Sequence, residues 1–282
     1  MLSHTTSRRF PQVVPAFFDL GHNPTVPFTL AHAAAALPLR RMRLVWSALV
    51  IGTFAPDFEY FLRLAPDSRY GHTLRGTFLL TLPVSLAVLW LFHNVVKAPV
   101  AQLLPIGIRC RLVNELGEFR FGGASRFAMI VISILVGVAT HLVWDSFTHA
   151  NTWLYRDWSA LHVPIRVPIL GAAPIYKLLQ HGSTIFGIGV LSIWALTWYR
   201  KAEPHAEPPT KYVSKWQELI VIAGVISVGF VGAAIRAIVA LGLPTGHIAR
   251  TQFVGLWIST LIALLWWQLV LYGAWWKSVQ RS

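Results

Sequence analysis

Long apolar runs separated by short polar segments dominate this sequence. Five of these runs are long enough, or nearly so, to cross about 30 Å of hydrocarbon as helices. Tryptophans gather at several of their ends, as is typical of the aromatic belt at a membrane surface. The pattern predicts an all-α, integral membrane helical bundle with about five spanning helices, at residues 77–96, 127–145, 183–199, 218–241 and 252–276.

Two shorter apolar runs, 30–39 and 44–55, precede the first predicted span. Neither is long enough to cross a bilayer as a helix. They flank a basic turn that contains Arg40, Arg41 and Arg43. We interpret them as a short N-terminal helical hairpin whose basic turn points to one side and whose two open ends, with His32 and Asp57, point to the other.

The N-terminal segment, residues 1–25, is polar and lacks periodicity. We expect a disordered extension there, with a translation start downstream of it as the alternative. Residues 26–276 are expected to form a single membrane domain. Within it, residues 26–200 carry the candidate site and residues 216–276 add further helices.

The composition excludes several classes of protein. Only 12% of the residues are charged, about half of what a soluble domain carries. The net charge of +13 does not indicate nucleic acid, because the basic residues lie mainly in loops between apolar runs, where they set membrane topology. The single cysteine, Cys110, excludes an internal disulfide framework and a thiolate metal cluster.

The distribution of loop charge predicts an orientation. With the turn at 40–43 on the cytoplasmic side, more loop Lys and Arg fall on that side than on the other. Most of the histidines then gather at the opposite, non-cytoplasmic face. We therefore expect a protein of the bacterial inner membrane, with its site on the non-cytoplasmic face and with membrane lipids as partners.

The segment 140–149 is the most informative motif. His141, Asp145 and His149 are four residues apart, so on a helix they share one face. Such a stripe in a membrane helix is costly unless something binds there, and a divalent metal suits these residue types. His141 and His149 would lie about 12 Å apart along the axis, too far to share one ion. His149 then serves a second ion, a substrate or the structure, and Asp145 could bridge two ions.

Threading the topology brings five candidate ligands to one end of the bundle. Three imidazoles and two carboxylates suit Zn, with Mn or Fe as alternatives. The alternative interpretations are a buried His–carboxylate pair that holds helices together and, for the aspartate after Pro56, a helix cap. The candidate ligands are His32, Asp57, His72, His141 and Asp145.

Other polar residues are candidates for supporting roles. Glu59 and His149 could transfer protons, and His181 could be a further ligand. Arg75 and Arg236 could hold an anionic phosphate, with interfacial anchoring as the alternative.

These motifs also carry a resemblance. They resemble an uncharacterised bacterial integral-membrane family that begins with a PFTLAH motif and is similar in turn to the YdjM-like membrane-bound metal-dependent hydrolases. The resemblance covers roughly 26–200, or through 276, and implies a metal-dependent hydrolase. The matching segments are Pro27-Phe28-Thr29-Leu30-Ala31-His32, Ala55-Pro56-Asp57, Gly71-His72-Thr73, and Thr140-His141 with Asp145 and Thr148-His149.

Two spacings, Asp57 to His72 and His141 to Asp145, are similar to those of the zinc-dependent phospholipase C and single-strand nuclease superfamily. That distant resemblance implies helix-borne ligands around zinc and cleavage of phosphoesters. The chain departs from the superfamily because it lacks the mature N-terminal Trp ligand and the second His-x3-Asp/Glu pair.

Three function classes follow from these observations. The first is a membrane-bound metal-dependent hydrolase that acts on an ester or phosphoester of a lipid or lipid-linked substrate. The second is a non-enzymatic membrane scaffold or binding protein with a structural or regulatory metal site. The third is a transporter, which ranks lowest because the polar residues cluster at one face instead of spreading through the membrane depth.

Overall fold

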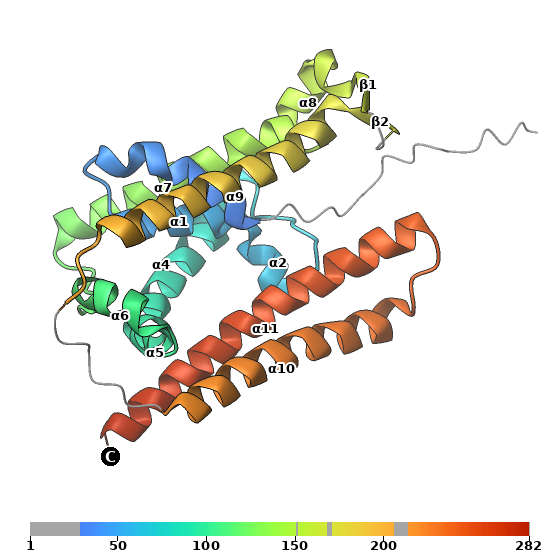
Figure 1. The fold of residues 1–282 in the computed structure, drawn as a ribbon. Helices are drawn as coiled ribbons and strands as arrows, with labels where there is room; N and C mark the ends of the chain where they lie inside the picture. Colours follow the sequence, from blue (N-terminus) through green and yellow to red (C-terminus); the bar gives the residue numbers. More distant parts are fainter. Residues whose placement is uncertain (1–28, 151, 168–170, 206–213, 282) are drawn as a thin grey trace, which may run out of the picture.

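The computed structural model describes residues 29–150, 152–167, 171–205 and 214–281. The described chain is almost entirely helical, which confirms the all-α prediction (Figure 1). The elements before the second span are η1 (Thr29–Arg41), α1 (Trp46–Phe54), η2 (Ala55–Asp57), α2 (Phe58–Arg63), α3 (Leu74–Gly76), η3 (Thr77–Thr81), α4 (Leu82–Leu91), η4 (Phe92–Val96), α5 (Lys97–Gln102), α6 (Ile106–Leu112) and η5 (Val113–Leu116). The remaining elements are α7 (Ala124–Thr148), α8 (Trp153–Asp157), η6 (Ser159–His162), β1 (Pro164–Val167), β2 (Gly171–Pro174), α9 (Ile175–Lys201), α10 (Lys215–Leu241) and α11 (His247–Arg281).

Five helical segments are long and apolar enough to cross a membrane, as predicted. Each extends beyond the predicted run, because the helices continue past their apolar stretches into polar residues at the ends. The first joins α3 to α5 into one helix with two short π-helical stretches, η3 and η4. The segments are Leu74–Gln102, Ala124–Asp157, Ile175–Lys201, Lys215–Leu241 and Ile248–Gln280.

Two pairs of long helices lie on opposite sides of a group of shorter helices that includes α2, α4 and α5 (Figure 1). α7 and α9 run side by side as one pair, and α10 and α11 form the other, antiparallel pair. α11 also packs against α2 and α5. At the far end of α7 and α9, β1 and β2 form a small antiparallel hairpin with Pro164 opposite Pro174. These are the strands found in the described residues, and at four residues each they are too short to give a periodic signal.

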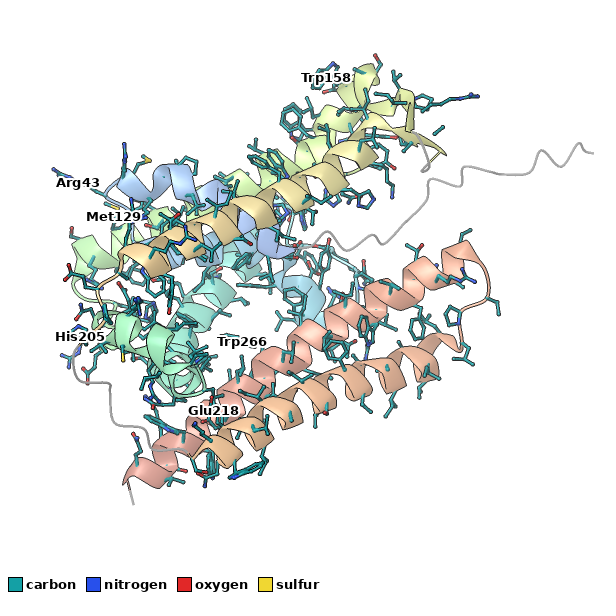
Figure 2. The ribbon with its side chains drawn as sticks, viewed as in Figure 1. Arg43, Met129, Trp158, His205, Glu218 and Trp266 are labelled. Atoms are coloured by element: carbon teal, nitrogen blue, oxygen red, sulfur yellow. The ribbon has the colours of Figure 1, made fainter. Side chains whose placement is uncertain are left out.

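The predicted N-terminal hairpin is present. η1 and α1 pack against each other, and the basic turn lies at the end of the bundle where α7 begins, as the labels of Arg43 and Met129 show (Figure 2). The open ends of the hairpin, with His32 and Asp57, lie far along α7 from that turn. The extension predicted at residues 1–25 lies outside the described residues.

The close crossing of α1 and α7 determines where the polar residues meet. A Cβ on Gly52 would lie 2.3 Å from the main-chain oxygen of Ile134, and a Cβ on Gly137 would lie 2.3 Å from that of Leu49. Only glycine permits such backbone contact. Buried Ala48, Ile51, Ala55, Leu89, Ile130, Ile134 and Val138 form the apolar core around the crossing.

Candidate metal centre

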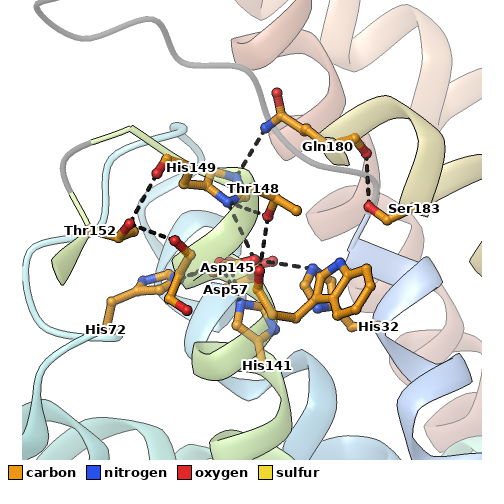
Figure 3. A network of polar contacts seen from close by, with 12 residues as sticks. His32, Asp57, His72, His141, Asp145, Thr148, His149, Thr152, Gln180 and Ser183 are labelled. Carbon is orange, nitrogen blue, oxygen red and sulfur yellow. Dashed lines mark hydrogen bonds and ion pairs between the residues drawn. The ribbon is translucent and has the colours of Figure 1, made fainter. Parts of the chain in front are cut away.

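All five predicted ligands converge on one buried cluster, with His149 beside them (Figure 3). They come from four separate parts of the chain. His32 lies in η1, Asp57 ends η2, and His72 lies in the loop before α3. His141 and Asp145 lie one turn apart on α7. We call these six residues, including His149, the His/Asp centre.

Four donor atoms surround one point in the His/Asp centre. His72 Nε2 lies 3.4 Å from Asp145 Oδ2 and 3.6 Å from Asp57 Oδ1. His141 Nε2 lies 3.1 Å from Asp145 Oδ2 and 3.6 Å from Asp57 Oδ1. Ligand atoms at tetrahedral positions around zinc, each about 2.1 Å from the ion, are about 3.4 Å apart. These four nitrogen–oxygen separations are of the size expected between ligands of one divalent ion, and the ligand atoms of Asp57, His72 and His141 all lie within 4.8 Å of one another.

The other oxygen of Asp145 faces a different pair of histidines. His32 Nε2 lies 3.5 Å from Asp145 Oδ1, and His149 Nδ1 lies 3.4 Å from the same oxygen. α7 ends at Thr148, so His149 has an extended backbone and its imidazole folds back toward Asp145. The i,i+4 spacing predicts a helix that continues through His149. The helix ends one residue earlier, and His149 still contacts Asp145.

A hydrogen bond fixes the protonation of His141. Its Nδ1 lies 2.8 Å from the main-chain oxygen of Thr53, and a carbonyl only accepts, so Nδ1 carries a proton. In the neutral ring, Nε2 then presents a lone pair toward Asp57 and Asp145. His141 Nε2 and Asp57 Oδ1 are buried and have no hydrogen-bond partner in the described part of the chain. Three acceptors facing one another require a cation between them, either a proton on Nε2 or a metal ion.

A second hydrogen-bond chain fixes His72. Ser68 Oγ donates to Glu59 Oε2 at 3.0 Å and lies 3.1 Å from His72 Nδ1. Because the hydroxyl proton is directed to the carboxylate, the serine oxygen accepts from His72 Nδ1–H. The Nε2 lone pair of His72 therefore also points into the His/Asp centre. Outer partners that fix a ligand's tautomer in this way are a general feature of metal sites.

Glu59 holds the loop that carries His72. Its Oε1 accepts from Arg63 Nε at 2.7 Å, and its Oε2 accepts from the main-chain N–H groups of Arg69, Tyr70 and Gly71 at 3.0, 2.8 and 2.7 Å. Burial raises the pKa of this carboxyl, but these hydrogen bonds outweigh it and lower the pKa to about 2. Oε1 is committed to Arg63 on α2 and Oε2 to the loop, so these contacts give Glu59 a positioning role. The proton-transfer role stays a prediction.

The remaining contacts order the other ligands. Thr29 Oγ1 donates to Asp57 Oδ2 at 2.7 Å, which leaves Oδ1 for the His/Asp centre. The His32 ring stacks on that of His141, with centroids 4.0 Å apart. Burial and the neighbouring His141 lower the pKa of His32 to about 4, so this imidazole is neutral at pH 7 and can act as a ligand. His149 Nε2 lies 3.1 Å from Gln180 Nε2 on α9.

Three further candidates lie outside the His/Asp centre. His181 is exposed on α9, and Arg75 is exposed in α3. Arg236 on α10 donates from Nη1 to Thr260 Oγ1 on α11 at 3.1 Å. The structure gives none of them a contact with the candidate ligands, and their predicted roles stay predictions.

Sequence reasoning did not identify the orienting residues Thr29, Thr53, Ser68 and Gln180. Thr29 lies within the PFTLAH motif, which was the one available signal. Thr53 acts through its main-chain oxygen, and Ser68 and Gln180 reach their histidines through a loop and a helix that no spacing in the sequence relates to them. Such contacts depend on tertiary packing and leave no local pattern.

Comparisons with known proteins give a family without an assigned activity. A search of curated proteins and a search of solved structures each found no match. A family model described as "Domain of unknown function (DUF4184)" matches residues 26–274, which include the whole His/Asp centre. The chain therefore belongs to the DUF4184 family.

Proposed function

We propose that this protein is a membrane-bound hydrolase that depends on a divalent metal held in the His/Asp centre. One observation carries the proposal. The hydrogen bonds of His72 and His141 fix their tautomers so that each Nε2 lone pair points at the carboxylates of Asp57 and Asp145. A cation bound between them would satisfy all four groups. The donor set of nitrogen and carboxylate oxygen suits Zn, with Mn and Fe as alternatives.

The chemistry follows from such a site. A divalent ion bound by these residues would lower the pKa of a coordinated water toward neutrality and supply hydroxide to an ester or phosphoester. The side chains of His72 and His149 are 28% and 22% exposed, whereas those of His32, Asp57, His141 and Asp145 are at most 8% exposed. A substrate would therefore approach from the side of His72 and His149.

The location supports a lipid or lipid-linked substrate. The His/Asp centre lies toward the C-terminal end of α7, within a candidate membrane span, and away from the basic turn that contains Arg43 (Figure 2). On the positive-inside rule, that turn is cytoplasmic and the centre opens toward the non-cytoplasmic face of a bacterial inner membrane. Because the apolar run of α7 ends at Val143, the centre would lie near the membrane surface, where the esters and phosphoesters of lipid headgroups lie. The resemblance to YdjM-like membrane-bound metal-dependent hydrolases agrees with this class of reaction.

A second candidate function is a non-enzymatic membrane scaffold or binding protein with a structural metal. The observation that favours it is burial, because Asp57 and His141 are almost completely enclosed by protein. Structural metal sites are closed by protein ligands, whereas catalytic sites keep an open position. Metal-dependent thermal stability without turnover would support this function.

The test is made on the full chain purified in detergent. Metal content is measured by elemental analysis, and turnover is measured with vesicles of phospholipids and with soluble phosphomonoester, phosphodiester and carboxylester substrates. We expect bound metal and turnover in the native chain, and loss of both in Asp57→Asn. His205→Ala is the control, since His205 is exposed at the opposite end of the bundle (Figure 2). Turnover that persists after complete metal removal would overturn the proposal.

A further inference from the structure

The two oxygens of Asp145 face different pairs of imidazoles. Oδ2 faces His72 and His141 at 3.4 and 3.1 Å. Oδ1 faces His32 and His149 at 3.5 and 3.4 Å. Figure 3 shows the four imidazoles arranged around this aspartate, from separate elements of the fold.

We infer that the His/Asp centre holds two divalent cations bridged by the carboxylate of Asp145. The inference rests on the proposed function, since it takes the centre to be a metal site. The first position has Asp57 Oδ1, His72 Nε2, His141 Nε2 and Asp145 Oδ2. The second has His32 Nε2, His149 Nδ1 and Asp145 Oδ1. Bridged pairs of this kind, about 3.5–4 Å apart, are the arrangement of two-metal hydrolytic sites.

The first position is complete without the remaining histidines. Its histidine nitrogens lie 3.1–3.6 Å from its carboxylate oxygens, and four protein donors would fill a tetrahedral shell. His141 and His149 are eight positions apart in the chain, and each approaches its own oxygen of Asp145. The two imidazoles of the Oδ1 side are therefore left to serve a separate ion.

The second position is prepared by an outer contact. The Gln180 amide lies 3.1 Å from His149 Nε2. The oxygen and nitrogen of an amide exchange places by a simple flip, and with the oxygen toward Nε2 the ring donates from Nε2–H. His149 Nδ1 would then direct its lone pair between Asp145 Oδ1 and Thr148 Oγ1, which lie 3.4 and 3.0 Å away, while the Thr148 hydroxyl keeps its donation to the main-chain oxygen of Trp144. Gln180 would thus orient His149 in the way that Thr53 orients His141.

The two positions differ in the number of protein donors. The first has four and the second has three. Each includes one partly exposed histidine, His72 at 28% and His149 at 22%, so both can be reached from the same side. Catalytic metal positions have three protein ligands and an open place for water or substrate. The second ion would therefore exchange more readily and contact the substrate.

Manganese loading of the full chain in detergent tests the inference. We expect two equivalents of Mn²⁺ to bind, with an electron paramagnetic resonance signal of two coupled ions. His149→Ala should bind one equivalent and give the six-line signal of an isolated ion. Gln180→Leu, which removes no donor and keeps a helix-forming side chain, should bind the second equivalent 10- to 100-fold more weakly. His205→Ala is the control and should keep both ions.

One equivalent in the native chain, with an isolated-ion signal that His149→Ala leaves unchanged, would overturn the two-ion centre while leaving the proposed function standing. Binding of no metal would overturn both. Should His149→Ala fail to fold, the stoichiometry and signal of the native chain decide whether two ions bind, and Gln180→Leu decides where the second one lies. A second equivalent bound as tightly as in the native chain would overturn its assignment to His149.

Discussion

His141 donates from Nδ1 to the main-chain oxygen of Thr53 at 2.8 Å, across 88 positions of sequence. This contact ties the end of α1 to the ligand-bearing face of α7 and selects the tautomer whose Nε2 faces Asp57 and Asp145. It exists because α1 and α7 touch backbone to backbone at Gly52 and Gly137. The crossing of α1 and α7 therefore also determines how His141 is oriented in the His/Asp centre.

Gly52→Ala should therefore weaken the centre as well as the fold. The added Cβ would lie 2.3 Å from the backbone oxygen of Ile134, so the helices must separate. We expect a loss of about 1–3 kcal/mol of stability and weaker metal binding, since His141 loses its partner. Thermal unfolding and metal titration in detergent measure the two effects. The control is Gly189→Ala on α9, where a Cβ meets no atom within 4 Å.

Ser68→Ala should lower metal affinity about 10- to 100-fold, because His72 Nδ1 loses its outer partner. The melting temperature of the metal-free protein should change little. Ser278→Ala, at an exposed end of α11, is the matched control. Equal metal affinity in Ser68→Ala and in the native chain would show that the hydrogen-bond chain from Glu59 does not orient His72.

The lowered pKa of Glu59 predicts that the stability of the folded protein depends on pH. Its pKa is about 2 in the folded protein and about 4.5 as a free side chain, so the folded state favours the ionised form. The contribution of the ionised Glu59 to the free energy of unfolding is complete above pH 4.5 and is lost as the pH falls through about 2. In metal-free protein, Glu59→Gln should cost on the order of 2 kcal/mol at pH 7 and progressively less below pH 4.5. A cost that is constant from pH 7 to pH 3 would contradict this prediction.

Metal removal should destabilise the native chain. A ligand that binds only the folded state at about 1,000 times its Kd contributes about 4 kcal/mol. A chelator should therefore lower the melting temperature, and added Zn²⁺ should restore it. In Asp57→Asn the chelator should have little effect, because the ion is already weakly held. An unchanged melting temperature of the native chain in chelator would speak against a bound ion.

The spans could be predicted because apolar length alone determines them. The five ligand positions could also be chosen, since carboxylates and imidazoles at one end of apolar helices are costly without a partner. The role of Glu59 could not be predicted, because it depends on three main-chain N–H groups of the loop 69–71. The end of α7 at Thr148 and the contact of His149 with Gln180, which comes from another helix, could not be predicted either.

The central claim is that the His/Asp centre binds a divalent cation, and elemental analysis of the full chain purified in detergent tests it most directly. The claim predicts at least one tightly bound divalent ion per chain, with His141→Ala and Asp57→Asn free of that ion and His205→Ala still loaded. A folded native chain that holds no metal after incubation with Zn²⁺, Mn²⁺ or Fe²⁺, or a His141→Ala variant that holds as much as the native chain, would contradict it.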